Sequence, residues 1–171
     1  MTERTGVVTF QGAPLTLVGS EIRVGDMAPD FSVVDNDLNP ATLADFKGKK
    51  LVIAAVPSLD TPVCDMEVRR FNAEAASLSS DVKILTMSMD LPFAQKRWCG
   101  AAGVDAVQTL SDYMDASFGE AYGVLIKELR LLARAVFVVD PGGKVLHVEY
   151  VPDITHEPDY QKALDAVKSL S

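Results

Sequence analysis

The chain has 171 residues, with 23% charged and 48% hydrophobic residues, and its 16 basic and 24 acidic side chains give a net charge of −8. This length predicts one domain with its own hydrophobic core, and the composition excludes wholesale disorder. The acidic charge argues against nucleic acid or an anionic membrane as a partner, since both require local positive charge.

The first third of the chain predicts short strands. Two apolar runs, 7–10 and 15–18, are separated by turn residues and predict a β-hairpin, which we take as an N-terminal extension over residues 1–19. A third short strand is expected at 30–34. Residues 51–56 form a continuous apolar run with β-branched side chains, which is typical of a strand buried on both faces.

The remainder of the chain alternates between helices and strands, because apolar residues recur at a helical period between further continuous apolar runs. In chain order we expect a helix over 61–78, a strand over 82–89, a helix over 92–102 that breaks near Gly100 and Gly103, a short helix over 115–122, strands over 133–139 and 145–151 joined by a Gly-rich turn, and a helix over 158–170. This order predicts a single α/β domain over residues 1–171. It is compatible with a thioredoxin-like fold, in which helices flank a mixed central sheet and an N-terminal β-hairpin precedes it.

Cysteine and histidine are scarce in this sequence. Cys64 and Cys99 are too few for a disulfide scaffold, and no paired spacing indicates a zinc site. The N-terminal residues lack the apolar stretch of a secretory signal, and no apolar run approaches the roughly 20 residues that span a bilayer. A cytoplasmic location is therefore expected, where thiols are normally kept reduced.

The surroundings of Cys64 indicate a reactive thiol. The strand over 51–56 stops at Pro57, a polar loop follows, and Thr61 and Pro62 are favoured residues at the N-cap and first position of a helix. Cys64 then lies in the first turn, where free backbone N–H groups and the helix dipole favour an anion such as a thiolate. The alternative is a buried, inert cysteine that packs as a small hydrophobic residue.

For two other residues, Arg134 and Cys99, the sequence allows both a structural and a catalytic role. Arg134 interrupts the apolar run 131–139, and an unpaired buried charge is costly. It either reaches water at a strand start or neutralises a thiolate with its planar fork of donors. Cys99 is the second thiol, and it either packs beside Trp98 or reacts with an oxidised Cys64.

The spacing of Pro57, Thr61 and Cys64 resembles the PxxxTxxC active-site signature of the peroxiredoxins. Further blocks, spread in order through nearly the whole chain, are similar to the bacterial thiol peroxidase branch, an atypical two-cysteine group: 57–64, 68–72, 90–95, 99–101, 133–136 and 157–160.

The resemblance implies a role for each candidate residue. Cys64 is expected to be the peroxidatic cysteine that a hydroperoxide oxidises to a sulfenic acid, and Cys99 the resolving cysteine that forms a disulfide with it within one subunit. Thr61 is expected to hydrogen-bond the thiolate and the peroxide. Arg134 is expected to stabilise the thiolate and polarise the O–O bond, and Pro57 to shield the pocket.

The resemblance also implies the partners. Thioredoxin is expected as the reductant, supplied by NADPH through its reductase, while NADPH itself is not expected to bind. No metal or organic cofactor is required. A homodimer is implied, as is a preference for alkyl hydroperoxides over hydrogen peroxide. Apolar residues near the motif are candidates for lining the substrate site or for filling the core: Leu59, Met87, Met89 and Phe93.

Two other functions remain open at this point. A thiol–disulfide oxidoreductase on the same fold is disfavoured, because that chemistry usually needs a Cys-x-x-Cys pair. A redox-inert thioredoxin-like binding module would use both cysteines as structural residues.

If both cysteines lie on neighbouring helices, the helix axes are expected about 8–10 Å apart, whereas a disulfide needs Cα atoms within about 7 Å. We therefore hypothesise that the Cys99 helix unwinds locally when the bond forms, with or without the first helical turn at Cys64. Gly100 and Gly103 would assist, since each weakens a helix by roughly 1 kcal/mol relative to alanine.

Overall fold

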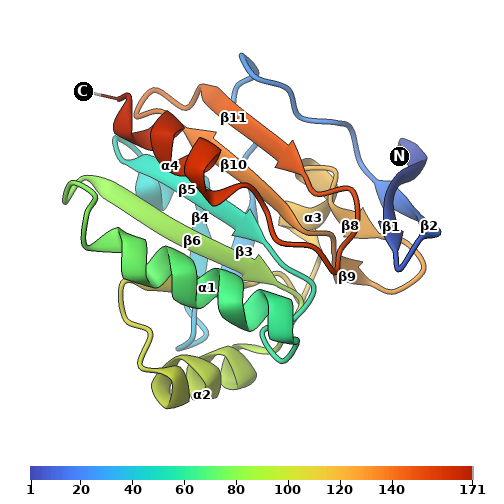
Figure 1. The fold of residues 1–171 in the computed structure, drawn as a ribbon, viewed down its shortest axis with the longest axis horizontal. Helices are drawn as coiled ribbons and strands as arrows, with labels where there is room; N and C mark the ends of the chain where they lie inside the picture. The colour runs from blue at the N-terminus through green and yellow to red at the C-terminus, as the bar shows by residue number, and fades with distance from the viewer. Residues whose placement is uncertain (171) are drawn as a thin grey trace.

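The structure is a computed structural model that describes residues 1–170, and its centre is a mixed sheet of seven strands (Figure 1). The strands are β3 (Ser32–Val34), β4 (Pro40–Thr42), β5 (Lys50–Ala55), β6 (Val82–Ser88), β7 (Val107–Ser111), β10 (Ala135–Val139) and β11 (Val145–Tyr150). Their order across the sheet is β11-β10-β5-β6-β7-β3-β4. Strands β5, β6 and β7 are parallel to one another, and the strands on either side are antiparallel to them.

A second, smaller sheet contains the N-terminal hairpin. Its strands are β1 (Glu3–Phe10), β2 (Ala13–Val18), β8 (Leu125–Ile126) and β9 (Leu131–Leu132), in the order β1-β2-β8-β9 and all antiparallel. The β1–β2 hairpin therefore starts four residues earlier than the apolar run at 7–10 indicates. It is anchored by pairing between β2 and β8.

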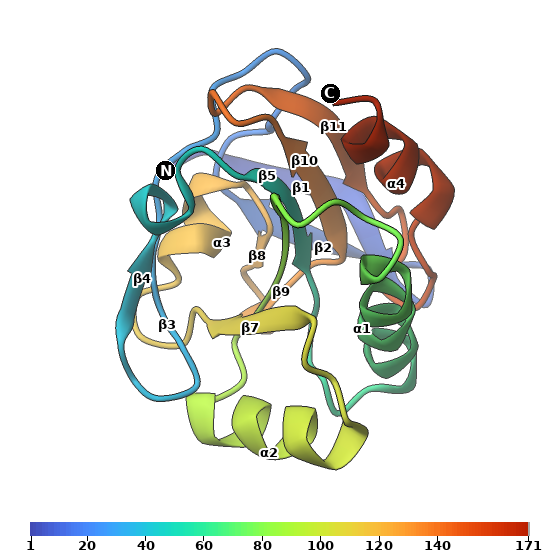
Figure 2. The same cartoon turned by 90° about the vertical axis from the view of Figure 1, so that its left-hand side faces the viewer.

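The helices lie on the two faces of the central sheet. They are α1 (Pro62–Ala75), α2 (Pro92–Ala102), α3 (Ser117–Ala121) and α4 (Tyr160–Lys168), with a 3-10 helix, η1, at Leu43–Phe46. Figure 2 shows α1 and α4 on one side of the sheet and α3 on the other. Within residues 1–170, no helix combines the length and the apolar character needed to cross a membrane.

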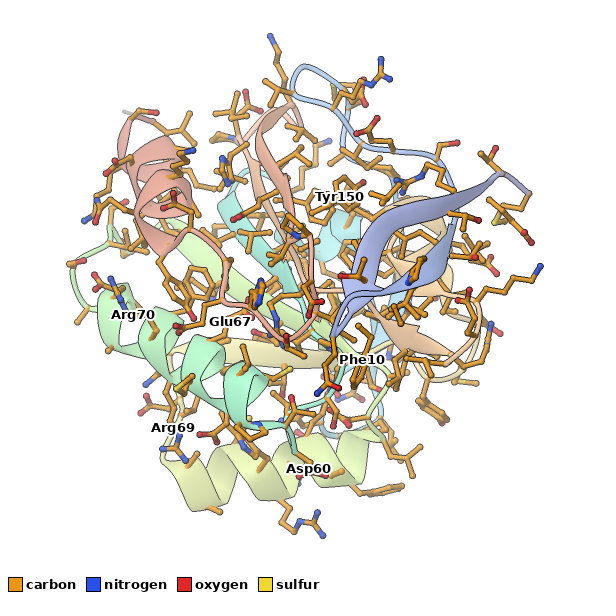
Figure 3. The ribbon with its side chains drawn as sticks, turned by 45° about the vertical axis from the view of Figure 1, so that its right-hand side comes forward. Phe10, Asp60, Glu67, Arg69, Arg70 and Tyr150 are labelled. Carbon is orange, nitrogen blue, oxygen red and sulfur yellow. The ribbon has the colours of Figure 1, made fainter. Side chains whose placement is uncertain are left out.

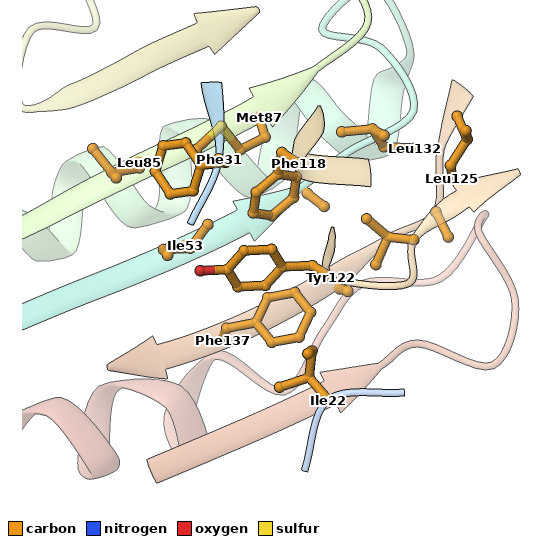
Figure 4. Close-up of a cluster of buried hydrophobic side chains, with 14 of the residues drawn as sticks. Ile22, Phe31, Ile53, Leu85, Met87, Phe118, Tyr122, Leu125, Leu132 and Phe137 are labelled. Carbon is orange, nitrogen blue, oxygen red and sulfur yellow. The ribbon is translucent and has the colours of Figure 1, made fainter. Parts of the chain in front are cut away.

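Strand β5 shows why the centre of the sheet is apolar on both faces. Leu51 and Ile53 pack into the core on the α3 side, whereas Val52 and Ala54 pack into the core beneath α1 and α4. Every residue of β5 is buried, as the continuous apolar run predicts. On the α3 side, four aromatic rings pack together in the core (Figure 4): Phe31, Phe118, Tyr122 and Phe137.

The predicted α/β fold with a mixed sheet is confirmed, and the differences are local. Helix α2 does not break at Gly100 but continues to Ala102, and Gly103 ends it in the left-handed conformation, with φ +68°. Gly100 is exposed and has ordinary helical geometry, so the helix tolerates it. The sequence did not predict β4, β7, β8 or β9. Three of these have only two or three residues, and β7 places polar side chains in buried positions.

Candidate active site

Cys64 lies in the first turn of α1, directly after the loop that leaves the carboxyl end of β5. Thr61 is the N-cap of α1 with extended backbone angles (φ −94°, ψ 147°), and Pro62 occupies the first helical position. The Cys64 residue is 0% exposed and packs against the core on the α1 side of the sheet. The expected placement of Cys64 at a helix N-terminus is thus confirmed, and there the unpaired backbone N–H groups favour an anionic sulfur.

The Thr61 hydroxyl does not cap the helix in the usual way. It donates a hydrogen bond of 2.8 Å to the Ser58 carbonyl, and the Thr61 N–H also binds that carbonyl at 3.1 Å. The donated proton leaves the lone pairs of the Thr61 oxygen directed away from Ser58. Pro57 is buried between β5 and this turn.

Arg134 is the charged partner of Cys64. Its guanidinium is 1% exposed, and Nη2 donates a hydrogen bond of 3.2 Å to the Cys64 sulfur. Nη1 donates to Glu67 Oε2 at 2.6 Å, and Nε and Nη2 donate to the Ile154 carbonyl at 3.1 and 2.8 Å. The interpretation in which Arg134 reaches water is therefore wrong, because its guanidinium is buried and is bound by α1 and by the segment that contains Ile154.

Glu67 is a site residue that the sequence analysis missed. It lies one turn after Cys64 on the buried face of α1, and Figure 3 shows Glu67 and Arg69 on opposite sides of that helix. Burial raises the pKa of Glu67 from 4.5 to about 7, although the Arg134 guanidinium opposes the rise. The available signal was a glutamate three residues after Cys64, on a helix face that is otherwise apolar.

Arg134, Glu67 and Cys64 form a buried cluster, in which the guanidinium faces a carboxyl and a thiol. Burial lowers the pKa of Arg134, but Glu67 and the Cys64 sulfur outweigh this effect, so the pKa is raised above its ordinary value. The guanidinium therefore stays charged, and it stabilises whichever neighbour is ionised. Within residues 1–170, Glu67 Oε1 has no hydrogen-bond partner, which leaves this oxygen available to carry a proton.

Asp90 holds the loop before Cys64 in position. Its carboxylate accepts hydrogen bonds from the Ser58 hydroxyl at 2.7 Å and from the Leu59 N–H at 2.9 Å. The same carboxylate accepts from Ser88 Oγ at 2.8 Å, and Ser88 Oγ in turn accepts from Gln95 Nε2 at 2.9 Å. Since Gln95 belongs to α2, this network links the loop before Cys64 to the helix that contains Cys99.

Cys99 lies in a different environment from Cys64. Both thiols are free, and Cys99 Sγ lies 3.4 Å from Thr109 Oγ1, which donates to Asn36 Oδ1 at 3.0 Å. These residues line a polar cavity of about 410 Å³. The neighbouring Trp98 occupies the side of α2 that faces α1, where its Nε1 donates to Asp65 Oδ1 at 3.0 Å. The structure thus brings Cys64 and Arg134 together, and it directs Cys99 toward β7.

The apolar residues near the motif differ in their exposure. Leu59 and Met87 are buried in the core, Met89 is partly buried, and Phe93 is 65% exposed on α2. Within residues 1–170, no cluster of three or more His, Cys, Asp or Glu side chains could hold a metal ion.

Comparisons with known proteins agree on one family. The Redoxin family pattern matches residues 23–164. The thiol peroxidase of Bacillus subtilis (strain 168) is 60% identical over 163 residues, which cover 95% of this chain and 97% of that protein. The thiol peroxidase of Staphylococcus aureus (strain MRSA252) is 56% identical over 163 residues, which cover 95% of this chain and 98% of that protein.

Two solved structures share the fold. The crystal structure of a peroxiredoxin-like protein from Aquifex aeolicus superposes with a TM-score of 0.90 at 44% identity, over 98% of each chain. A thiol peroxidase from Chromobacterium violaceum superposes with a TM-score of 0.84 over 95% of each chain. At 21% identity, the second likeness concerns the fold alone.

Proposed function

We propose that this chain, which belongs to the Redoxin family and is a thiol-dependent peroxidase, reduces hydrogen peroxide and alkyl hydroperoxides through Cys64. The observation that carries the proposal is the buried hydrogen bond of 3.2 Å from Arg134 Nη2 to the Cys64 sulfur. A guanidinium in direct contact stabilises a thiolate, and the thiolate is the nucleophilic form of cysteine.

In the proposed first step, the Cys64 thiolate attacks one oxygen of the hydroperoxide. A sulfur–oxygen bond forms and the O–O bond breaks, so sulfur loses two electrons and the second oxygen leaves as an alkoxide or hydroxide. That oxygen takes up a proton to become an alcohol or water, and Cys64 becomes a sulfenic acid. No metal or organic cofactor takes part in this balance.

The neighbouring residues stabilise the charge that moves in this step. Arg134 faces the sulfur and favours the negative charge that develops on the leaving oxygen, as donors in an oxyanion hole do. The Thr61 oxygen, whose proton is donated to Ser58, accepts a hydrogen bond from the peroxide O–H and orients it. Pro57, buried beside the loop, restricts access of water to the sulfur.

Cys99 is proposed to resolve the sulfenic acid. Its thiol attacks the Cys64 sulfur within the same subunit, a disulfide forms, and the sulfenic oxygen leaves as water. The hydrogen bonds of Cys99 to Thr109 and of Trp98 to Asp65 support a rearrangement of α2 before this step, because they hold the thiol against β7 and place Trp98, not Cys99, against α1. Amide exchange over 92–103 that is equal in the reduced and oxidised proteins would contradict the rearrangement.

A thiol reductant then closes the cycle. We propose thioredoxin, which exchanges its dithiol for the Cys64–Cys99 disulfide and returns both thiols. This recycling requires a compartment in which thioredoxin is kept reduced, so the proposal includes a cytoplasmic location.

The proposed assembly is a homodimer. Four exposed apolar side chains support it: Leu91, Phe93, Tyr113 and Met114. They follow the carboxyl ends of β6 and β7, which are parallel neighbours, so both segments lie at the same end of the sheet. An exposed apolar group of this kind is typical of an interaction surface. Sedimentation that gives the mass of a monomer at micromolar concentration would contradict the dimer.

The cycle is tested by mixing the reduced protein with a hydroperoxide, thioredoxin, thioredoxin reductase and NADPH, and following NADPH loss. Turnover that Cys64→Ser abolishes is expected. Cys99→Ser is expected to give one round of oxidation without recycling, and normal recycling in that variant would exclude the resolving role. No turnover, with alkylation of Cys64 no faster than that of a free thiol at pH 7, would instead favour a binding module.

A further inference from the structure

A short segment between β11 and α4 connects Arg134 to the N-terminal hairpin. The Thr9 N–H donates to the Pro152 carbonyl at 2.8 Å, and the Ile154 N–H donates to the Thr9 carbonyl at 3.0 Å. Thr9 and Asp153 form an isolated parallel bridge, so residues 152–154 lie alongside the end of β1. Figure 3 labels Phe10, the residue after Thr9, at this end of the molecule.

The Asp153 side chain strengthens this attachment. Its Oδ2 accepts from the Thr9 hydroxyl at 2.6 Å and from the Gly12 N–H at 3.1 Å, while Oδ1 accepts from the Thr155 N–H at 3.0 Å and the Thr155 hydroxyl at 2.5 Å. Asp153 is 7% exposed. Hydrogen bonds from Thr155 and Thr9 hold the pKa of Asp153 well below its ordinary value, so the carboxylate stays ionised at neutral pH. Charge-assisted hydrogen bonds of this kind are the stronger ones.

Ile154 connects the hairpin to the active site through its two backbone groups. Its N–H binds Thr9 on one side, and its carbonyl accepts both the Nε and Nη2 hydrogen bonds of Arg134 on the other. Nη2 is also the atom that donates to the Cys64 sulfur. The Ile154 carbonyl therefore holds the same Nη2 group that faces the sulfur, and with Glu67 it fixes the orientation of the guanidinium.

We propose that the N-terminal hairpin is a positioning element for catalysis, in which Thr9 and Asp153 hold the Ile154 carbonyl and thereby orient Arg134 toward Cys64. This inference rests on the proposed function, in which Arg134 stabilises the Cys64 thiolate and the leaving oxygen. The Redoxin pattern covers residues 23–164, and the hairpin precedes them. The hairpin is therefore an addition to the Redoxin domain that contacts the site from outside it. Small displacements of a reacting group lower rates strongly, which gives such a support a kinetic consequence.

The test compares two threonines of the same strand in a Cys99→Ser background, where Cys64 is the sole thiol. Thr9→Val removes the hydroxyl that binds Asp153. Thr5→Val makes the same chemical change in β1, where the hydroxyl contacts only Thr16 Oγ1, at 3.2 Å. Asp153→Asn is the second test variant. It weakens the same attachment and leaves the sequence of the hairpin strands unchanged.

Two measurements follow for each variant: the second-order rate constant for oxidation of Cys64 by cumene hydroperoxide, and the pH profile of Cys64 alkylation by iodoacetamide. Thr9→Val and Asp153→Asn are expected to slow oxidation about threefold to tenfold, comparable to the loss of one hydrogen bond. Their alkylation profiles should move to higher pH, because the thiolate is less well stabilised. Thr5→Val should match the parent in both. A structural role alone would lower the thermal midpoint without moving the alkylation profile.

The inference is overturned if Thr9→Val and Asp153→Asn match Thr5→Val in rate and alkylation profile while Arg134→Lys is impaired. In that result Arg134 acts on Cys64, and the hairpin does not orient it. The proposed function itself fails in a different way, if Cys64→Ser retains peroxidase activity or if Arg134→Lys oxidises as fast as the parent.

Discussion

Replacing Glu67 by glutamine should remove a pH dependence of stability that the buried cluster creates. Glu67 is fully buried one helical turn from Cys64, and burial raises its pKa from 4.5 to about 7. Between these two pH values the folded protein binds a proton that the unfolded chain has released. The stabilisation by this proton is complete below about pH 4.5, decreases as the pH rises, and is lost above about pH 7.

The size of the effect follows from the same two values. Each pKa unit corresponds to about 1.36 kcal/mol, so the free energy of unfolding should fall by about 3 kcal/mol across this range because of Glu67. Glutamine keeps the shape of the protonated acid and can still accept from Arg134, but it cannot ionise. The Glu67→Gln chain should therefore lack this fall.

Urea denaturation at pH 5 and pH 8 measures the difference. The parent and the Glu67→Gln chain both carry Cys64→Ser and Cys99→Ser, so that no thiol titrates or oxidises during the experiment. Glu74→Gln is the matched control, since Glu74 lies on the same helix but pairs with Arg70 at the surface. Equal decreases in the free energy of unfolding for the parent and the Glu67→Gln chain would refute the assignment of the buried proton to Glu67.

Three further changes probe the site, the core and the second thiol. Arg134→Lys should slow oxidation of Cys64 by about 10²–10³-fold in stopped-flow measurements, because an ammonium group cannot bridge the same partners; a loss below tenfold would contradict this role. Phe71→Ala should lower the free energy of unfolding by about 3–5 kcal/mol, since the ring is fully buried, and an unchanged urea midpoint would contradict the packing. Thr109→Val should speed alkylation of Cys99 several-fold, because it removes the hydroxyl beside the sulfur, and an unchanged rate would show that this contact does not hold the thiol.

The position of Cys64 at the start of a helix can be predicted from its neighbours in sequence. Pro57, Thr61 and Pro62 mark the end of a strand and the start of a helix, and the first turn of that helix contains Cys64. These signals depend on neighbours in sequence, so a single sequence carries them. The same holds for β5, whose continuous apolar run indicates burial on both faces.

Long-range partners account for what the sequence did not predict. The burial of Arg134 depends on Glu67 and Ile154, which lie 67 and 20 residues away along the chain. The Ile154 contribution is a backbone carbonyl, and every residue type supplies one. Strand β7 was missed for a related reason, because Thr109 is polar in sequence and becomes a buried residue only beside Asn36 and Cys99.

The hydrogen-bond count at Arg134 limits how a substrate can be held. A guanidinium has five N–H donors, and within residues 1–170 four of them are engaged: two by Ile154, one by Glu67 and one by Cys64. In the proposed mechanism one N–H on Nη1 remains for an incoming hydroperoxide, so its other polar contacts must come from other groups, such as the proposed contact to the Thr61 oxygen. A single N–H contact from Arg134 would recognise the O–O group of a hydroperoxide and not the organic group attached to it. Discrimination among hydroperoxides would then rest on the shape of the entrance to the site rather than on Arg134.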